Sequence, residues 1–245
     1  MMGARFDEKV VLVTGSSSGI GEATARAFQA QGATVVVNSA RSVEAGKAVA
    51  ASLERATYLQ ADIADPDDCQ RLVDDVRAIF GRLDVLVNNA GTTRVIPHHD
   101  LDAATDDAFR EIFEVNVFGT FRLIRLAMPL LRESNGSVVN VTSLAGVRPT
   151  GSSIPYAASK AALNHLTALV ANVTGPAVRV NAVAPGLVRT PWTSDWGPLH
   201  DTMADRAPMG RSAEPDDVAR VIVDVAAAEY MTGQVVVVDG GLGLR

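Results

Sequence analysis

The chain has 245 residues, of which 47% are hydrophobic and 20% are charged, a composition typical of one globular domain with a sizeable core. Its formal net charge of −6 argues against nucleic acid or an anionic membrane surface as a partner. No apolar run approaches the roughly 18 residues that a membrane span needs, and the N-terminal segment up to Lys9 holds no apolar export region. We therefore expect one soluble, cytoplasmic domain over residues 1–245 that acts on a small molecule.

Short apolar runs alternate with helical patterns along the whole chain. The expected strands are Val10–Val13, Ala33–Val37, Thr57–Gln60, Asp84–Val87, Ser137–Val141, Val178–Val183 and Gln234–Val238. The expected helices are Glu22–Gln31, Ser42–Leu53, Asp67–Phe80, a long stretch from about Thr105 to Leu131, the helix that holds Tyr156, and Asp216–Ala227. Because each parallel crossover needs a helix, this alternation predicts an α/β, Rossmann-type, doubly wound sheet of about seven parallel strands with helices on both faces.

A glycine-rich turn, Thr14 to Gly21, follows the first strand directly and opens a helical pattern. Backbone N–H groups in such a turn can approach a phosphate, with the positive end of the helix behind them. The spacing, G-x-x-x-G-x-G, also fits a purely structural tight turn. We interpret the turn as a dinucleotide-binding site.

Further polar segments fall where later strands end. They are Asp62, Asn88–Gly91, Ser143 and Pro185–Thr190. Because ligands of parallel sheets bind beyond the carboxyl ends of the strands, we expect one crevice to collect these segments together with the glycine turn.

Tyr156 and Lys160 are the candidates for chemistry. They lie four residues apart in a helical run that starts after Pro155, so both side chains leave one face of the helix. A neighbouring ammonium favours the phenolate and lowers the pKa of a tyrosine, as an acid or base working near neutral pH requires. Ser143, at the end of a strand, can offer a hydroxyl to the same spot. Taken alone, the pair also fits two chance neighbours on a solvated helix face.

No metal site is predicted. Cys69 is the only cysteine, so no internal disulfide can form, and no Cys/His cluster has the spacing of metal ligands. We interpret the adjacent His98 and His99 as surface residues in a loop.

From about Lys9 to Gly241 the chain resembles the short-chain dehydrogenase/reductase family, in motifs that follow the family's order. These motifs are Thr14–Gly21, Asn88–Gly91, Asn116 within Val-Asn-Val-Phe-Gly, Ser143, Tyr156 with Lys160, and Asn181–Gly186 with Thr190. The resemblance implies a hydride-transfer enzyme that interconverts a carbonyl and an alcohol, with a catalytic tetrad of Asn116, Ser143, Tyr156 and Lys160.

The resemblance also implies a role for each member of the tetrad. Tyr156 would exchange a proton with the substrate oxygen, and Ser143 would hydrogen-bond the same oxygen. Lys160 would lower the tyrosine pKa and hold the nicotinamide ribose. Asn116 would sit mid-helix and keep a water beside Lys160, and the alternative is a helix-interior asparagine bonded to a neighbour.

The predicted cofactor-binding residues come from the motifs of the resemblance and from the ends of the second and third strands. They are Gly15, Ser16, Ser17, Ser18, Gly19, Ile20 and Gly21 in the turn, Asn38, Ser39, Arg41 and Ser42 after the second strand, Asp62 and Ile63 beside the adenine, Asn89, Ala90 and Gly91, Tyr156 and Lys160, and Pro185, Gly186, Val188 and Thr190.

The end of the second strand predicts a preference for NADP(H), while NAD(H) stays open. A carboxylate there would bind a ribose hydroxyl and repel a 2′-phosphate, but the segment Asn38-Ser39-Ala40-Arg41-Ser42 holds no acid. Arg41 can pair with the phosphate, and Ser39 or Ser42 can donate a hydroxyl. The alternative is that Arg41 faces solvent, and Ser16 to Ser18 lack the basic residue that many NADP-preferring relatives carry.

The substrate is less well defined by the sequence. Val37–Ser42 and the spacing from Ser143 to Tyr156 are similar to those of 3-oxoacyl-(acyl-carrier-protein) reductases, although Leu126–Leu131 and Leu163–Pro176 lack the basic residues with which those enzymes face an acidic carrier. The segments before Asn181 and Tyr230 also look about a residue shorter than is usual. The alternatives are an NAD-dependent alcohol, sugar or steroid dehydrogenase of the same family, or a nucleotide-binding protein without turnover.

A segment at about residues 190–213 has the composition of a lid. It carries Trp192, Trp196, Leu199, Met203 and Met209 among polar residues and prolines, so it suits substrates with some hydrophobic surface. It is equally explained as a loop anchored on its own domain. The resemblance further implies a homo-oligomer, which we expect to be a homotetramer. Apolar residues around Phe113, Val117, Phe121 and Leu169 could supply its interfaces, or they could equally face the sheet.

Overall fold

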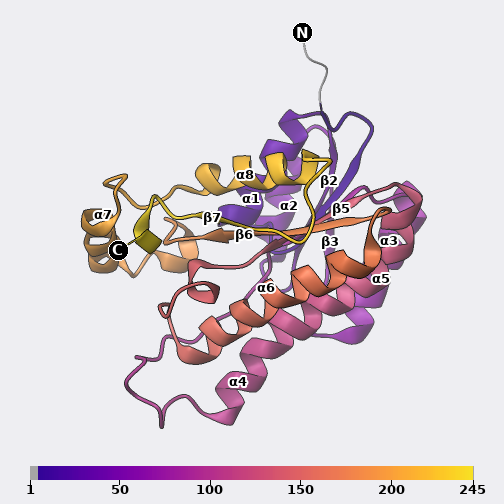
Figure 1. The fold of residues 1–245 in the computed structure, drawn as a ribbon. Helices are drawn as coiled ribbons and strands as arrows, with labels where there is room; N and C mark the ends of the chain where they lie inside the picture. The colour runs from indigo at the N-terminus through magenta and orange to yellow at the C-terminus, as the bar shows by residue number, and fades with distance from the viewer. Residues whose placement is uncertain (1–4, 245) are drawn as a thin grey trace.

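The computed structural model describes residues 5–244 and shows a parallel sheet between two layers of helices (Figure 1). The first four residues of the segment considered for export, and Arg245, lie outside the described residues. The strands are β1 Val10–Val13, β2 Thr34–Ser39, β3 Ala56–Gln60, β4 Val85–Asn88, β5 Ser137–Val141, β6 Arg179–Pro185 and β7 Val235–Val238. The helices are α1 Gly19–Ala30, α2 Val43–Ala51, α3 Pro66–Phe80, α4 Asp106–Phe113, α5 Thr120–Glu133, α6 Ile154–Thr174, α7 Gly197–Arg206 and α8 Pro215–Ala227.

The sheet confirms the expected doubly wound architecture. Its strand order is β3-β2-β1-β4-β5-β6-β7, and every neighbouring pair is parallel. The order reverses between β1 and β4, and a crevice opens at such a reversal because the loops after the two strands lead to opposite faces of the sheet. The glycine turn follows β1 and the Asn89–Gly91 segment follows β4, so both lie at this point.

Two apolar cores hold the layers together, as expected of a parallel sheet that is covered on both faces. One face of the sheet packs against α1, α2 and α8 through side chains such as Phe28, Val49 and Ile222. The other packs against α3, α5 and α6, with Leu72 and Leu123 among its fully buried residues. Figure 1 shows α8 and α1 on one side of the strands and α3, α5 and α6 on the other.

The structure differs from the expected helices at two places. The long stretch after Thr105 is interrupted by a π-helical turn at Glu114–Gly119, between α4 and α5. A Cβ on Gly119 would overlap the carbonyl of Ile63, so the close approach of these backbones fits the wider turn. The lid segment contains a short helix, α7, which its prolines and mixed polarity did not predict.

Within residues 5–244, no helix is long and apolar enough to cross a membrane, and no three His, Cys, Asp or Glu side chains are grouped to hold a metal ion.

Candidate active site

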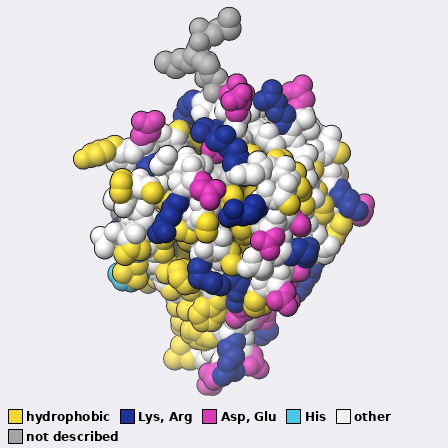
Figure 2. Space-filling model, turned by 90° about the vertical axis from the view of Figure 1, so that its right-hand side faces the viewer, with side chains coloured by type: hydrophobic (Ala, Val, Ile, Leu, Met, Phe, Trp, Pro, Cys, Tyr) yellow, Lys and Arg dark blue, Asp and Glu magenta, His cyan; other side chains and the backbone are white. Residues whose placement is uncertain are grey.

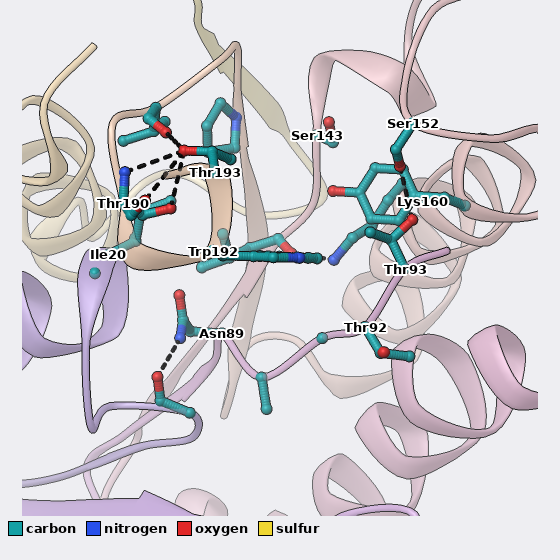
Figure 3. A pocket seen from close by; sticks show the side chains of 18 of the residues that line it. Ile20, Asn89, Thr92, Thr93, Ser143, Ser152, Lys160, Thr190, Trp192 and Thr193 are labelled. Atoms are coloured by element: carbon teal, nitrogen blue, oxygen red, sulfur yellow. Dashed lines mark hydrogen bonds between the residues drawn. The ribbon is translucent and has the colours of Figure 1, made fainter. Parts of the chain in front are cut away.

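A cavity of about 1240 Å³ opens at the carboxyl edge of the sheet (Figure 3). Its walls come from the glycine turn and from the segments that follow β2 to β6 and include the N-terminal part of α6. The structure therefore brings together the segments that the sequence predicted to meet. Three of the predicted site residues, Ser16, Gly21 and Asn116, lie behind this wall and do not line the cavity.

The glycine turn is built by close backbone contacts. Gly15 and Gly19 have φ values of 62° and 57°, a region that side chains other than glycine disfavour. A Cβ on Gly21 would overlap the Gly15 carbonyl and the Asn89 amide. Asn89 in turn donates to the carbonyl oxygens of Thr14 and Gly15, at 2.9 and 3.0 Å. The turn is thereby fixed against the end of β4, and it forms a cradle that a bulkier residue would fill.

Ser16 and Ser18 have different places in this turn. The Ser16 hydroxyl donates to the Val13 carbonyl at 2.7 Å and the Ser16 N–H to the Asn38 carbonyl at 2.8 Å, so Ser16 stabilises the turn and has no N–H left for a phosphate. Ser18 precedes α1 without capping it through its side chain, and together with Gly19 and Ile20 it lines the cavity. The first N–H groups of α1 can therefore serve an anion.

At the end of β2, the polar side chains are divided between structural bonds and the cavity. The Ser39 hydroxyl is buried and bonds to the Ser42 carbonyl at 3.0 Å and to the Tyr58 hydroxyl at 2.9 Å. Asn38 likewise donates to the carbonyl oxygens of β3 and the segment after it. By contrast, Arg41 and Ser42 are exposed at the cavity, and Arg41 forms no ion pair within the described part of the chain. Of the four polar side chains at the end of β2, those of Arg41 and Ser42 thus remain free to bind a ligand.

Asp62 and Ile63 line the cavity beyond β3, where the sequence placed the adenine. The Asp62 carboxylate accepts the N–H of Ala64 at 3.0 Å, which fixes the loop. Ile63 is buried, and its carbonyl accepts the guanidinium of Arg122 at 3.0 Å. The end of the cavity where we predict the adenine is therefore held by contacts within the chain.

Tyr156, Ser143 and Lys160 meet in the middle of the cavity wall. Ser153 caps α6, and its hydroxyl accepts the Tyr156 N–H at 3.3 Å, which places the phenol in the first turn of the helix. Lys160 lies one turn further along, with Nζ 5.7 Å from the centre of the Tyr156 ring. The Lys160 ammonium donates to the Val141 carbonyl at 3.0 Å, so it is anchored to the end of β5.

The prediction that Lys160 lowers the pKa of Tyr156 is wrong for the protein without a bound cofactor. Burial raises the pKa of Tyr156, and the nearby Ser143 hydroxyl lowers it by a smaller amount. Burial also lowers the pKa of Lys160 from 10.5 to about 8. The spacing of four residues placed the two groups correctly, but desolvation by the surrounding segments, and not the neighbouring charge, sets the direction of both pKa shifts. At neutral pH the phenol therefore keeps its proton.

Asn116 occupies the π-helical turn and is fully buried. Its Oδ1 accepts the N–H of Thr92 at 2.8 Å, and its Nδ2 donates to the Thr92 carbonyl and to the Ser159 hydroxyl, both at 3.0 Å. The side chain is thus bonded to its neighbours, which is the alternative that the sequence left open. A Cβ on Gly91 would lie 3.2 Å from Asn116 Oδ1 and 3.5 Å from Lys160 Nζ, so the two groups flank this glycine. The role in holding a water stays a prediction.

Another part of the cavity wall consists of Pro185, which ends β6, and of Gly186, Val188 and Thr190, which follow it. The lid continues from there, and Trp192 meets the Tyr156 ring edge to face, with the centres 6.3 Å apart and the planes at 86°. Trp196, Leu199 and Met203 also line the cavity, whereas Met209 does not.

Sequence reasoning missed several residues of the wall. They include Thr93, Ser152 and Leu242, and only the tertiary structure brings them to the cavity. Thr93 and Ser152 share a hydrogen bond of 2.7 Å between their hydroxyls (Figure 3). His98, which we interpreted as a surface residue, also lines the cavity, and its Nε2 is buried with no partner among the described residues.

The class of protein follows from where this chemistry lies. A phenol, an ammonium and a hydroxyl share one cavity with a glycine turn of the kind that binds phosphate groups. These features define a dinucleotide-dependent oxidoreductase. The glycine cradle and the free N–H groups of α1 fit the phosphates of such a cofactor.

Comparison with known proteins agrees with this class. A family model described as "Enoyl-(Acyl carrier protein) reductase" matches residues 15–243. A protein of Streptomyces violaceoruber named "Granaticin polyketide synthase putative ketoacyl reductase 2" is 54% identical over 239 residues, which are 96% of each chain. Among solved structures, a short-chain dehydrogenase/reductase of Brucella melitensis is 32% identical with a TM-score of 0.92, covering 98% of this chain and 99% of the other.

Another solved structure bears on the cofactor. It is the Pseudomonas aeruginosa RhlG/NADP active-site complex, which is 30% identical with a TM-score of 0.91 and covers 99% of this chain and 100% of the other. The chain belongs to the short-chain dehydrogenase/reductase family, and it is an oxidoreductase.

Proposed function

We propose that the protein is an NADP(H)-dependent reductase that interconverts a carbonyl and a secondary alcohol, with 3-oxoacyl thioesters as its substrate class. The observation that carries the proposal is the meeting of Tyr156, Ser143 and Lys160 in one cavity with the glycine turn. The identity of 54% with a ketoacyl reductase supports the substrate class.

The chain's own residues account for the proton transfer and the charge. The nicotinamide cofactor, when bound, supplies the hydride that adds to the carbonyl carbon. The Tyr156 hydroxyl then gives its proton to the carbonyl oxygen, and Ser143 stabilises the negative charge that develops there. A raised pKa keeps this proton on the phenol at neutral pH, which suits an acid in the direction of reduction. The buried ammonium of Lys160 stabilises the phenolate that remains.

The preference for NADP(H) depends on the residues after β2. Arg41 can form a charge-assisted pair with a 2′-phosphate, and the Ser42 hydroxyl, which does not cap α2, can donate to the same group. The buried Ser39 hydroxyl has its partners within the fold, so we assign the phosphate to Arg41 and Ser42 rather than to Ser39. The turn from Ala40 to Ser42 after β2 holds no carboxylate that would repel a phosphate.

A second substrate oxygen has a partner in the hydroxyl pair of Thr93 and Ser152. Either hydroxyl can be the donor of this pair, and Thr93 also has the Arg94 carbonyl within reach at 3.2 Å. In the arrangement in which Thr93 donates to Ser152, the Ser152 proton is free for a substrate oxygen, because a hydroxyl donates only once. A 3-oxoacyl thioester presents a second carbonyl next to the one that is reduced. The facing wall, with Trp192, Leu199 and Met203, suits the acyl chain, and we propose that residues 190–213 act as the lid.

We also propose that the protein is a homotetramer. Phe118, Phe121, Leu169 and Val173 have 53%, 43%, 54% and 72% of their surface exposed on α5, α6 and the π-helical turn. Figure 2 shows hydrophobic side chains gathered on the lower part of one face of the molecule. A patch of this kind is typical of a surface that binds another protein chain.

The test is the oxidation of NADPH by the purified protein with an acetoacetyl thioester and, in parallel, with a monoketone of similar size. We expect turnover of both and a higher kcat/KM for the thioester, and Ser152→Ala should remove that preference while sparing the monoketone. Binding of NADPH without oxidation by any ketone, diketone, quinone or thioester would instead identify a nucleotide-binding protein without turnover. A kcat/KM that favours NADH would point to an NAD-dependent dehydrogenase of the same family.

A further inference from the structure

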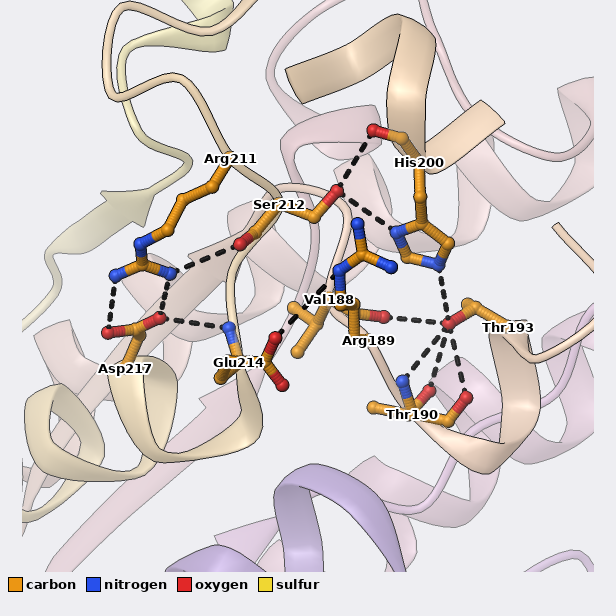
Figure 4. Close-up of polar contacts among 9 residues, drawn as sticks. All are labelled: Val188, Arg189, Thr190, Thr193, His200, Arg211, Ser212, Glu214 and Asp217. Atoms are coloured by element: carbon orange, nitrogen blue, oxygen red, sulfur yellow. Dashed lines mark hydrogen bonds and ion pairs between the residues drawn. The ribbon is translucent and has the colours of Figure 1, made fainter. Parts of the chain in front are cut away.

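A buried histidine lies in the lid, away from the candidate tetrad. His200 belongs to α7 and is only 3% exposed. Its Nδ1 is 3.0 Å from the Ser212 hydroxyl and its Nε2 is 3.2 Å from the Thr193 hydroxyl (Figure 4). Both ring nitrogens thus have a hydrogen-bond partner: Thr193 precedes α7 in the chain, and Ser212 follows it.

The hydrogen-bond inventory assigns the tautomer of His200. The Thr193 hydroxyl has one proton, and its shortest contact is the Val188 carbonyl at 2.7 Å, which therefore receives that proton. Thr193 can then only accept from His200, so Nε2 carries the imidazole proton. Nδ1 of the neutral ring accepts the proton of Ser212. In this arrangement both ring nitrogens of His200 and the hydroxyls of Thr193 and Ser212 each have a partner.

Thr193 connects the histidine to the predicted nicotinamide end of the cavity. Besides the bond to Val188, its Oγ1 accepts the Thr190 N–H at 3.2 Å and lies 3.3 Å from the Thr190 hydroxyl. Val188 and Thr190 are both predicted cofactor residues that line the cavity. One hydroxyl thus holds the backbone of this segment at two points.

The same helix carries the apolar side of the substrate wall. Leu199 and Met203 line the cavity, and His200 lies between them in the sequence. A shift of α7 relative to Val188 and Thr190 that separates His200 from Thr193 costs free energy, because buried polar groups are then left without a partner.

We infer that the His200–Thr193 hydrogen bond couples the lid helix to the nicotinamide-binding segment, so that cofactor and substrate bind cooperatively. His200 and Thr193 are positioning residues in this role, since they act through Val188, Thr190 and α7. The inference rests on the proposed function, in which this end of the cavity holds the nicotinamide. When the cofactor orders Val188–Thr190, the hydroxyl of Thr193 and the imidazole transmit that order to α7.

The test compares two Thr→Val substitutions in the lid. Thr193→Val removes the hydroxyl that contacts Val188, Thr190 and His200, whereas Thr202→Val removes an exposed hydroxyl on α7 that donates to the Pro198 carbonyl at 2.9 Å. Thr193→Ser keeps the hydroxyl and serves as the rescue variant. NADPH affinity is measured by quenching of tryptophan fluorescence, and hydrogen exchange of residues 197–206 is followed with and without NADPH.

We expect Thr193→Val to weaken NADPH binding by at least about tenfold, equivalent to 1.4 kcal/mol, and to abolish the protection of α7 by NADPH. Thr193→Ser and Thr202→Val should behave like the wild type. A role confined to folding would lower the melting temperature of Thr193→Val yet leave the NADPH-dependent protection of α7 intact, and that result overturns the inference. If Thr193→Val does not fold, His200→Phe tests the same bond with the same two readouts.

The outcome for the wild type separates this inference from the function on which it rests. A wild-type protein that binds no NADPH overturns both. A wild-type protein that binds NADPH and reduces ketones, but whose α7 exchanges equally fast with and without NADPH, overturns only the coupling.

Discussion

Replacing Lys160 by methionine should stabilise the protein while it removes activity. The side chain is 4% exposed, its Nζ has the Val141 carbonyl as hydrogen-bond partner, and no carboxylate pairs with it within residues 5–244. Methionine has nearly the same length and no charge, so it fills the same space without desolvating an ammonium. We therefore expect Lys160, the lysine of the proposed catalytic site, to lower the stability of the protein without cofactor.

The magnitude follows from the pKa of Lys160, which burial lowers from 10.5 to about 8. At 1.36 kcal/mol per pKa unit, this displacement corresponds to a destabilisation of about 3 kcal/mol at pH 7. Loss of the bond to the Val141 carbonyl costs about 1 kcal/mol. Lys160→Met should thus raise the free energy of unfolding by about 2 kcal/mol and the melting temperature by roughly 4–8 °C.

The pH dependence has a definite sign. Below pH 8 the lysine is charged in both states and its penalty is fully present. Between pH 8 and 10.5 the unfolded state binds more protons than the folded state, so the wild type gains stability with pH. The advantage of Lys160→Met should therefore shrink above pH 8 and be close to zero near pH 10.

Urea denaturation at pH 7 and pH 10, without nucleotide, measures both effects. Lys47→Met is the matched control, because Lys47 is exposed and pairs only with Glu44 on the surface. It should change the stability by less than about 0.5 kcal/mol at either pH. A Lys160→Met variant that is less stable than the wild type at pH 7, or whose advantage does not depend on pH, would refute the reasoning.

Four further predictions concern the site and the assembly. Tyr156→Phe should lower turnover at least ~10²-fold and leave the NADPH dissociation constant nearly unchanged, because only the transferable proton is lost; retention of most of the rate would show that another group is the acid. Arg41→Ala should weaken NADPH binding by roughly tenfold, as expected for one solvent-exposed charge-assisted bond, and leave NADH binding unchanged; the exposed Arg132→Ala is the control, and an equal effect on both cofactors would contradict the assignment. Gly21→Ala should lower the melting temperature and abolish nucleotide binding, since its Cβ would overlap the turn. Gly197→Ala is the control and should do neither, because a Cβ on Gly197 meets nothing within 4 Å. Similar melting curves for the two variants would argue against the packing of the glycine turn. Light scattering at micromolar concentration should give the mass of a tetramer, and a monomer would disprove the proposed assembly.

The sequence by itself determined the fold and the position of most site residues. The seven strands and the helices between them follow from apolar periodicity, which depends on neighbours within a few residues, and the observed strand bounds differ from the expected ones by at most two residues. Because all the strands are parallel, their carboxyl ends lie together at one edge of the sheet. For this reason Gly15, Arg41, Ser143, Tyr156 and Lys160 could be assigned to one cavity before any coordinates were known.

Only the tertiary structure decided which side chains are free to act. The Ser39 hydroxyl is hydrogen-bonded to Tyr58 of β3, and the Asn116 side chain is hydrogen-bonded to Thr92 and Ser159. These partners lie far away along the chain, so residue spacing could not predict the contacts. The π-helical turn likewise lies where two distant backbones meet, since Gly119 lies against the carbonyl of Ile63.

The pKa values were also beyond the reach of the sequence. The spacing of Tyr156 and Lys160 predicts their attraction, which acts within one helical turn, but not the desolvation that raises one pKa and lowers the other. Desolvation depends on how many atoms from distant segments exclude water from a group. The bonding of His200 to Thr193 and Ser212 has the same origin, since the lid brings these residues together only when it folds back on the end of β6.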